Sequence, residues 1–212
     1  DRCRQEAVAD SGQVVLYLDE LQYYRRPGVE RSWGKRGKQP TVERKAVSKY
    51  AWSRHLVCAI DPEDGRLYWR HESKLDRGLL TTFYGQLVEA YPKAERIWLI
   101  QDNLPLHFHS DILHELEPQQ WPFPFPHPPT WPDPSAAAEA DGPLPIQLTP
   151  LPTYASWLNP VERFWRTLRR QVLYLHRHGK HARRLAASVD RHLQSRQNEG
   201  RRVLQETGLS CA

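Results

Sequence analysis

The stretch L-P-T-Y-A-S-W-L-N-P-V-E-R-F-W, residues 151–165, marks an abrupt change from extended chain to helix. Asn159 is a residue type that caps helix N-termini, and Pro160 suits the first helical turn. Apolar residues then recur at helical spacing, as Val161, Phe164, Trp165, Leu168, Val172 and Leu175. The pattern predicts a helix that begins at Pro160 and carries one acid, Glu162, in its first turn.

Two roles are open to Glu162 on this stretch alone. A Glu three residues after an Asn cap is placed to close a capping box, which is a structural role. The other role is that of the last of a set of active-site acids. The positions of other acids along the chain are needed to weigh the second role.

Composition bounds the class of protein. The 212 residues suit one domain of ordinary to large size, and 30 Lys and Arg against 25 Asp and Glu favour polyanionic partners. Cys3, Cys58 and Cys211 are scattered, which predicts neither a zinc site nor a disulfide framework. No apolar run is long enough to cross a bilayer, so we expect a soluble protein in a reduced cytosol. The chain has no methionine, even at position 1, and we expect it to be a fragment whose missing part precedes Asp1.

Working outward from the opening stretch, five short apolar or β-branched runs predict strands. They span residues 14–18, 50–60, 66–71, 96–100 and 146–151. The turn at 61–65 joins the second and third, so the first three form an antiparallel meander. Amphipathic spacing predicts a helix over 75–91, and a short helix is expected over 107–116. The sequence thus predicts an α/β fold, a mixed five-stranded sheet flanked by helices.

Acids follow two of the predicted buried strands. Asp19 and Glu20 come after the first strand and Asp102 after the fourth. Such acids can simply face solvent where a strand ends. If the first and fourth strands are neighbours, however, Asp19 and Asp102 emerge together and the helix carrying Glu162 can lean over them. Three carboxylates at one point repel one another unless cations neutralise them, and a pair of Mg²⁺ or Mn²⁺ ions is the natural partner.

Several short sequence motifs, in their order along the chain, resemble those of a known family. They are L-D-E at 18–20, R-S-W-G-K-R-G-K-Q-P at 31–40, Q-D-N at 101–103 with His107 beyond it, and residues 151–165. Over roughly 14–178 the chain resembles the DDE transposases of bacterial insertion sequences related to mariner elements. The resemblance implies a ribonuclease-H-like domain in which Asp19, Asp102 and Glu162 bind two divalent ions. It also implies cleavage of transposon-end DNA, transfer of the freed 3′ end to target DNA, a homodimer in the DNA complex, and a bacterial cytoplasmic protein that joins the nucleoid on DNA.

Further residues have expected supporting roles. Asn103 is expected to orient its loop by side-chain hydrogen bonds, and His107 either to support a carboxylate or phosphate or to pack locally. Basic residues predicted to contact DNA phosphates are Arg31, Lys35, Arg36 and Lys38 in the basic segment 25–54, and Arg166, Arg169 and Arg170 after Glu162. A solvated basic loop is the alternative for the first group. Trp33 and Trp165 are expected to pack.

The predicted organisation has three parts. Residues 1–12 are a linker or truncated start, 13–180 the catalytic domain, and 181–212 a basic helical tail. A Pro-rich insertion at about 117–145 separates Asp102 from Glu162 by 60 positions, farther than is usual in the family, and is either harmless or redirects the site. Its aromatic residues are expected to cover the domain's own surface. The alternatives to an active transposase are a catalytically inactive DNA-binding remnant and another ribonuclease-H-like nuclease.

Overall fold

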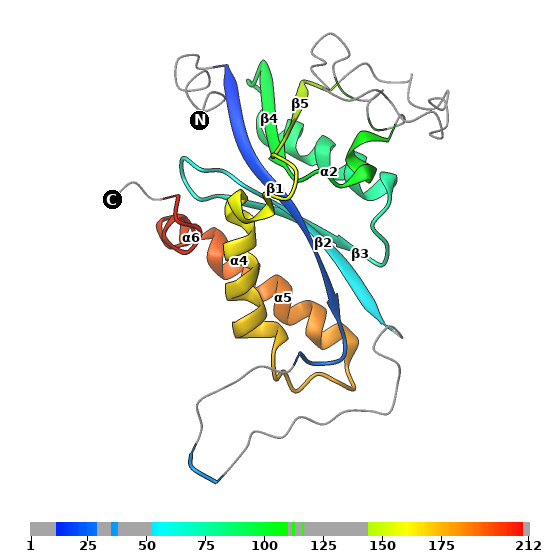
Figure 1. Cartoon of the computed structure of the whole chain (residues 1–212), viewed down its shortest axis with the longest axis vertical. Helices are drawn as coiled ribbons and strands as arrows, with labels where there is room; N and C mark the ends of the chain where they lie inside the picture. The colour runs from blue at the N-terminus through cyan, green and yellow to red at the C-terminus, as the bar shows by residue number, and fades with distance from the viewer. Residues whose placement is uncertain are drawn as a thin grey trace.

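One mixed sheet of five strands organises the chain, whose computed structural model describes residues 12–28, 35–37, 52–109, 112, 116 and 144–209. The strands are β1 (Gln13–Tyr24), β2 (Ser53–Ile60), β3 (Leu67–Glu72), β4 (Arg96–Gln101) and β5 (Ile146–Pro150). They lie in the order β3-β2-β1-β4-β5 (Figure 1). The pairs β1–β2 and β2–β3 are antiparallel, whereas β1–β4 and β4–β5 are parallel. The predicted meander and mixed sheet are confirmed.

Strand β1 is longer than the sequence predicts. We expected it to end before Asp19 and Glu20, but both acids lie inside the strand, which continues to Tyr24. The reason is that β1 changes neighbours along its length. It pairs with β4 up to Tyr17, while β2 pairs with it from Tyr17 to Tyr24. The two acids therefore lie just past the point where β4 stops covering one edge of β1.

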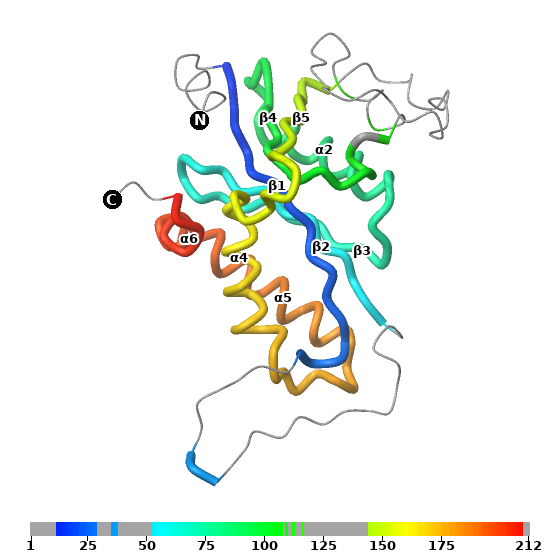
Figure 2. The backbone as a smooth tube through the Cα atoms, viewed as in Figure 1, coloured from blue at the N-terminus to red at the C-terminus, as the bar shows by residue number. Residues whose placement is uncertain are grey.

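Helices cover both faces of the sheet (Figures 1 and 2). Helix α2 (Arg77–Ala90) lies on one face, and its first turn is capped by Asp76, whose Oδ1 accepts from the Leu79 amide at 3.0 Å. The helices α4 (Pro160–Leu168), α5 (Ala182–Gln197) and α6 (Gly200–Thr207) lie on the other. None of the described helices has the length and apolar character needed to cross a membrane.

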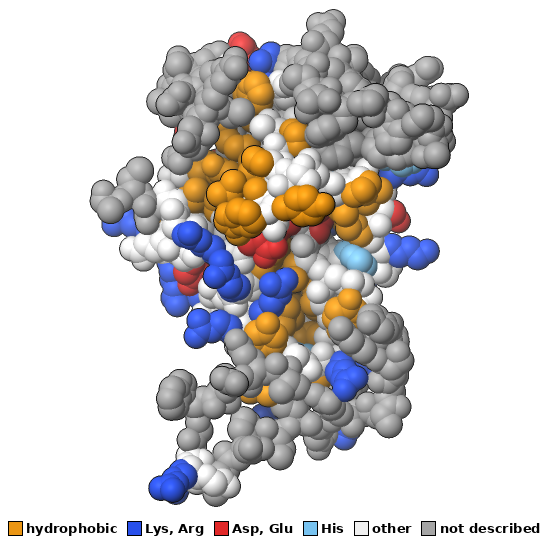
Figure 3. Space-filling model, in the orientation of Figure 1, with side chains coloured by type: hydrophobic (Ala, Val, Ile, Leu, Met, Phe, Trp, Pro, Cys, Tyr) orange, Lys and Arg blue, Asp and Glu red, His pale blue; other side chains and the backbone are white. Residues whose placement is uncertain are grey.

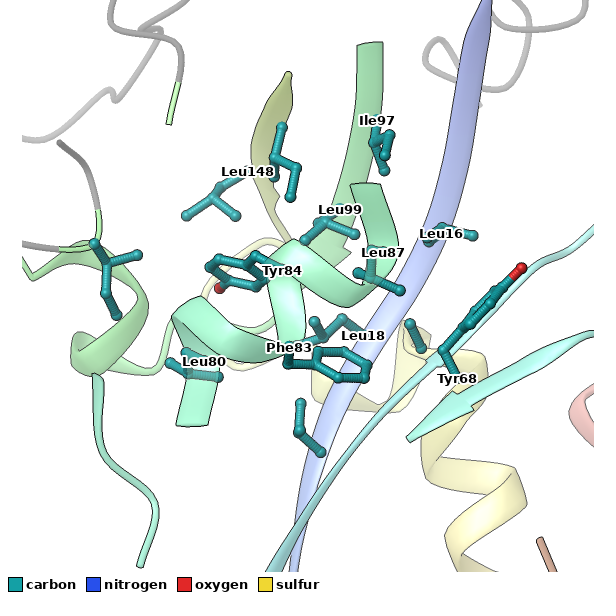
Figure 4. Close-up of a cluster of buried hydrophobic side chains, with 14 of the residues drawn as sticks. Leu16, Leu18, Tyr68, Leu80, Phe83, Tyr84, Leu87, Ile97, Leu99 and Leu148 are labelled. Atoms are coloured by element: carbon teal, nitrogen blue, oxygen red, sulfur yellow. The ribbon is translucent and has the colours of Figure 1, made fainter. Parts of the chain in front are cut away.

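Two hydrophobic cores follow from the alternation of side chains along β1. Leu16 and Leu18 point to the α2 side, where they pack with Phe83, Tyr84 and other residues of the first core (Figure 4). Leu21 and Tyr23 belong to the second core, under α4, α5 and α6. The same alternation puts neighbouring residues on opposite faces of the sheet. Asp19 must therefore face α4, and Glu20 must face α2.

Two segments differ in detail from the predicted helices. The helix after Glu162 is α-helical to Leu168 and continues as a π-helix over Arg169–Leu173, so Leu175 lies beyond it, with φ of 49°. The helix expected over 107–116 begins earlier, as a 3₁₀ helix at Pro105–Phe108, and the part beyond it lies largely outside the described residues. Most of the Pro-rich insertion and the start at 1–11 also lie outside them.

Candidate active site

Asp19 is the most deeply placed acid of the predicted set. Its residue is 7 % exposed, and its pKa is raised to about 8. Burial is the main cause, because it penalises the charged carboxylate, and the negative charges of Glu20, Glu162 and Asp102 add to it. The structure thus brings the charges of Asp102 and Glu162 close enough to act on Asp19.

Helix α4 is tied to β1 at Leu18 and at Asp19. The Asn159 side chain caps the helix through Oδ1, which accepts from the Val161 amide at 3.1 Å. Its Nδ2 donates to the Leu18 carbonyl at 2.7 Å. Further along the helix, the Trp165 indole Nε1 donates to Asp19 Oδ2 at 2.9 Å. These two bonds between the helix and the strand place the first turn of α4, with Glu162, over Asp19.

The capping-box role of Glu162 is not what the structure shows. The Asn159 amide donates to the Ser156 carbonyl at 2.9 Å, so it does not bond the Glu162 side chain. Glu162 lies half-buried in the first turn of α4, and its charge raises the pKa of Asp19. The Glu162 side chain therefore does not close a capping box and can take part in the acidic site.

Asp102 follows β4 directly. Because Tyr17 pairs with Ile100 in the parallel ladder, two more residues along each strand bring Asp19 level with Asp102. Asp102 Oδ1 accepts from the Leu104 amide at 3.0 Å. The loop is fixed by Asn103, whose Nδ2 donates to the Leu151 carbonyl at 2.6 Å, as the sequence predicts for this Asn.

The return of the chain after the Pro-rich insertion is also fixed at the site. The Leu151 amide donates to the Gln101 carbonyl at 2.8 Å, directly beyond the β4–β5 pairing. Residues 151–165 therefore begin beside Asp102 and end beside Asp19. The separation of 60 positions between Asp102 and Glu162 does not prevent the helix from delivering Glu162 to this face.

Glu20 was recognised in the sequence as an acid near the first strand, but it was not predicted to be a site residue. Among the described residues, Glu20, Asp102 and His107 have ligand atoms that all lie within 4.8 Å of one another. The predicted set of Asp19, Asp102 and Glu162 is spread more widely, as expected for three carboxylates that repel one another. His107 Nε2 lies 3.1 Å from Glu20 Oε1 and 4.0 Å from Asp102 Oδ1. Alternation along β1, which places Glu20 opposite Asp19, is the signal that could have drawn attention to Glu20.

His107 does more than pack locally. It is fully buried, and its Nδ1 lies 3.2 Å from the Tyr84 hydroxyl on α2. Burial and the Glu20 charge raise the pKa of Tyr84 well above its usual range, so this phenol keeps its proton. The contact between Tyr84 and His107 could not be predicted from sequence, because it depends on how α2 packs against the sheet.

The predicted DNA-contacting residues divide into three groups. Arg166 and Arg170 are exposed and Arg169 is half-buried, although only Arg166 lies in α4, since the π-helix begins at Arg169. Lys35 and Arg36 are exposed in a short turn. Arg31, Lys38 and Trp33 lie outside the described residues. Trp165 packs in the second core as expected, but its bond to Asp19 was not predicted.

The surface around the acids carries apolar as well as charged groups. Tyr154 is 90 % exposed and Trp157 68 % exposed, and both precede α4. Figure 3 shows hydrophobic side chains gathered on this face beside acidic ones, with Lys and Arg side chains nearby. Such a surface presents both flat rings and positive charge next to the carboxylates.

The donor set fits divalent cations. Asp19, Asp102 and Glu162 offer carboxylate oxygens, the ligands that Mg²⁺ and Mn²⁺ prefer. The pKa of Asp19 is raised mainly by burial, and the negative charges of Glu20, Glu162 and Asp102 raise it further. A cation between these carboxylates offsets this negative charge.

Fold and site together define a ribonuclease-H-like domain that gathers acids at the junction of two parallel strands. The family model of the DDE superfamily endonucleases matches residues 14–185. Since this match covers most of the chain, the protein belongs to the DDE superfamily endonuclease family. No curated protein sequence matches the chain.

Solved structures with the same fold include those of the Mos1 mariner transposase. The paired-end complex with Mn matches with a TM-score of 0.60 and 14 % identity, over 97 % of this chain and 54 % of that one. The complex with Mg matches with a TM-score of 0.55 and 13 % identity, over 92 % and 53 %. The complex with the left transposon end gives 0.51 and 12 %, over 97 % and 60 %. The chain thus spans little more than half the length of these transposase chains.

Proposed function

We propose that the chain is the catalytic domain of an insertion-sequence transposase that cuts DNA at the element's ends and joins the freed 3′ end to target DNA. The observation that carries the proposal is the attachment of α4 to β1. Through Asn159 and Trp165 it puts Glu162 beside Asp19, at the level where Asp102 leaves the sheet. Membership of the endonuclease family supports the assignment.

Asp19, Asp102 and Glu162 are the proposed ligands of two divalent ions, Mg²⁺ or Mn²⁺. When bound, such ions supply an activated water and positive charge at the phosphate being cut. Asp19 is the buried anchor, held by the Trp165 indole. Asp102 and Glu162 approach it from the loop after β4 and from the first turn of α4. The proposed role of each acid follows from the strand, loop or helix that carries it.

Around the acids, other side chains are proposed to hold the DNA. The exposed Arg166, Arg170 and neighbouring Arg169 would meet backbone phosphates, as would Lys35 and Arg36. The same role is proposed for Arg31 and Lys38. Tyr154 and Trp157 present rings on which unpaired bases at a cut end can stack.

The wider setting is also proposed rather than observed. The solved relatives are described as paired-end complexes, and a protein that cuts two ends of one element is expected to act as a homodimer. The resemblance to bacterial insertion sequences supports a cytoplasmic protein that joins the nucleoid on DNA. We propose a division of the chain into a start at 1–12, a catalytic domain at 13–180 with an insertion at about 117–145, and a basic tail at 181–212. Leu185, Val189 and Leu193 of the proposed tail pack into the second core.

The direct test is cleavage of DNA that carries the element's own ends. Purified protein with Mn²⁺ should nick that DNA, and Asp102→Asn should abolish the nicks while DNA binding persists. Lys74→Ala, an exposed change beyond the far edge strand β3, is a matched control that should cut normally. Cleavage that survives Asp102→Asn contradicts the proposal. Salt-sensitive binding without cleavage would identify an inactive remnant, and preference for an RNA–DNA hybrid would identify a different nuclease.

A further inference from the structure

A buried network of polar side chains lies directly behind Asp102, on the face of the sheet opposite Asp19. It is formed by Glu20 of β1, Tyr84 of α2 and His107 of the 3₁₀ helix. The Glu20 side chain is 9 % exposed and that of His107 0 %. A buried carboxylate is costly unless it is paired, so the contact between Glu20 and His107 is a specific feature of this fold.

The contacts around His107 fix the position of its ring. Glu20 Oε1, at 3.1 Å, and Asp102 Oδ1, at 4.0 Å, both face Nε2. The Tyr84 hydroxyl contacts Nδ1 at 3.2 Å and holds the ring from the other side. The imidazole ring thus lies between the Tyr84 hydroxyl on one side and the carboxylates of Glu20 and Asp102 on the other.

The two oxygens of Asp102 are treated differently by this arrangement. Oδ1 accepts from the Leu104 amide and faces His107. Within the described part of the chain, no hydrogen bond holds Oδ2. Since the side chain is 38 % exposed, Oδ2 is the oxygen available to a bound ion. Restraint of one oxygen orients the other.

We infer that Glu20, through His107 and with Tyr84, is a positioning residue that orients Asp102 for metal binding. The inference rests on the proposed function in assuming that Asp102 is a metal ligand. Glu20 acts through His107 and has no contact with the DNA in this role. Groups that orient ligating carboxylates are commonly worth about 10- to 100-fold in metal affinity or activity.

The molecule contains a natural control for this network. Tyr23, His71 and Asp190 repeat the arrangement away from the site, with the Tyr23 hydroxyl 2.8 Å from His71 Nδ1 and His71 Nε2 3.4 Å from Asp190. Tyr84→Phe and Tyr23→Phe therefore delete the same hydroxyl from equivalent contacts. Only the first of them lies behind Asp102.

The test is titration of the whole protein with Mn²⁺ in the absence of DNA, by calorimetry, with thermal melting of each metal-free variant. Tyr84→Phe and Glu20→Gln should each raise the Kd for Mn²⁺ by about tenfold or more, whereas Tyr23→Phe should leave it unchanged. In the Asp102→Asn background, Glu20→Gln should have no further effect on Mn²⁺ binding. A purely structural role would lower the melting temperature without changing the Kd.

The outcomes separate this inference from the proposed function. If Asp102→Asn itself leaves Mn²⁺ binding unchanged, Asp102 is not a ligand and the proposed function fails with it. If Asp102→Asn weakens binding while Tyr84→Phe and Glu20→Gln do not, only the positioning network is wrong. Should Glu20→Gln weaken binding equally in the Asp102→Asn background, Glu20 acts on the metal independently of Asp102, which also overturns the inference.

Discussion

Replacing Trp165 with Phe removes one hydrogen bond from the centre of the site while keeping an aromatic ring in the core. The indole Nε1 donates to Asp19 Oδ2 at 2.9 Å inside the protein, and the ionised carboxylate is the form that benefits most. A hydrogen bond to a charged group contributes about 1.5–3 kcal/mol. Its loss should further raise the pKa of Asp19, so that the carboxylate gives up its proton less readily to a cation.

The expected result of Trp165→Phe is a 10- to 100-fold weaker affinity for Mn²⁺ at pH 7, since about 1.4 kcal/mol corresponds to a factor of ten. Calorimetric titration measures it directly. Trp69→Phe is the matched control, because the Trp69 indole also donates to an aspartate, Asp190, at 3.4 Å, but away from the acids. Both variants should melt at lower temperature than the wild type. Equal Mn²⁺ affinity in wild type and Trp165→Phe would refute the argument that this bond supports Asp19 as a ligand.

Four further outcomes are expected. The cation binds the ionised carboxylate of Asp19, whose pKa is about 8, so Mn²⁺ affinity should rise about fiftyfold from pH 6 to pH 8 and then level off. Calorimetric titration at several pH values measures this rise, and Asp19→Asn should remove it. The metal-free protein should lose stability as pH rises from about 4 to about 8, because the folded state keeps a proton that the unfolded state releases, and urea unfolding at several pH values checks this. Asn159→Ser keeps a capping oxygen but loses the bond to the Leu18 carbonyl, so stability should fall by about 1–3 kcal/mol and cleavage should slow. Arg166→Ala should weaken DNA binding and reduce the slope of log affinity against log salt concentration by about one, whereas Lys74→Ala should change neither. Binding measured at several salt concentrations checks this.

Local patterns in the sequence were sufficient to predict the sheet. The β-branched run before Asp19, the turn at 61–65 and the period change at α2 each depend on neighbouring residues, and the structure confirms the elements they predict. The cap at Asn159 was predicted for the same reason. The extent of β1 was not, because residues 19–24 become a strand through pairing with β2, which is distant in sequence.

The site was only partly predictable for a related reason. The acidic residues are evident in the sequence, but the side of the sheet toward which each side chain points was not predicted. Glu20 was grouped with Asp19, although alternation along β1 sends the two side chains to opposite sides of the sheet. Trp165 looked like a packing residue, and its indole bond depends on the angle at which α4 crosses β1. Contacts that depend on tertiary packing cannot be predicted from local sequence patterns and are seen only in the structure.

The central claim is that Asp19, Asp102 and Glu162 together hold divalent ions for DNA cleavage. Anomalous diffraction from crystals of the protein soaked in Mn²⁺ tests it most directly. The account predicts two anomalous peaks bounded by these three carboxylates, with Oδ2 of Asp102 as a ligand, and their loss in crystals of Asp19→Asn. Peaks between Glu20 and His107 instead, or a Glu162 carboxylate that points away from bound Mn²⁺, would contradict the claim.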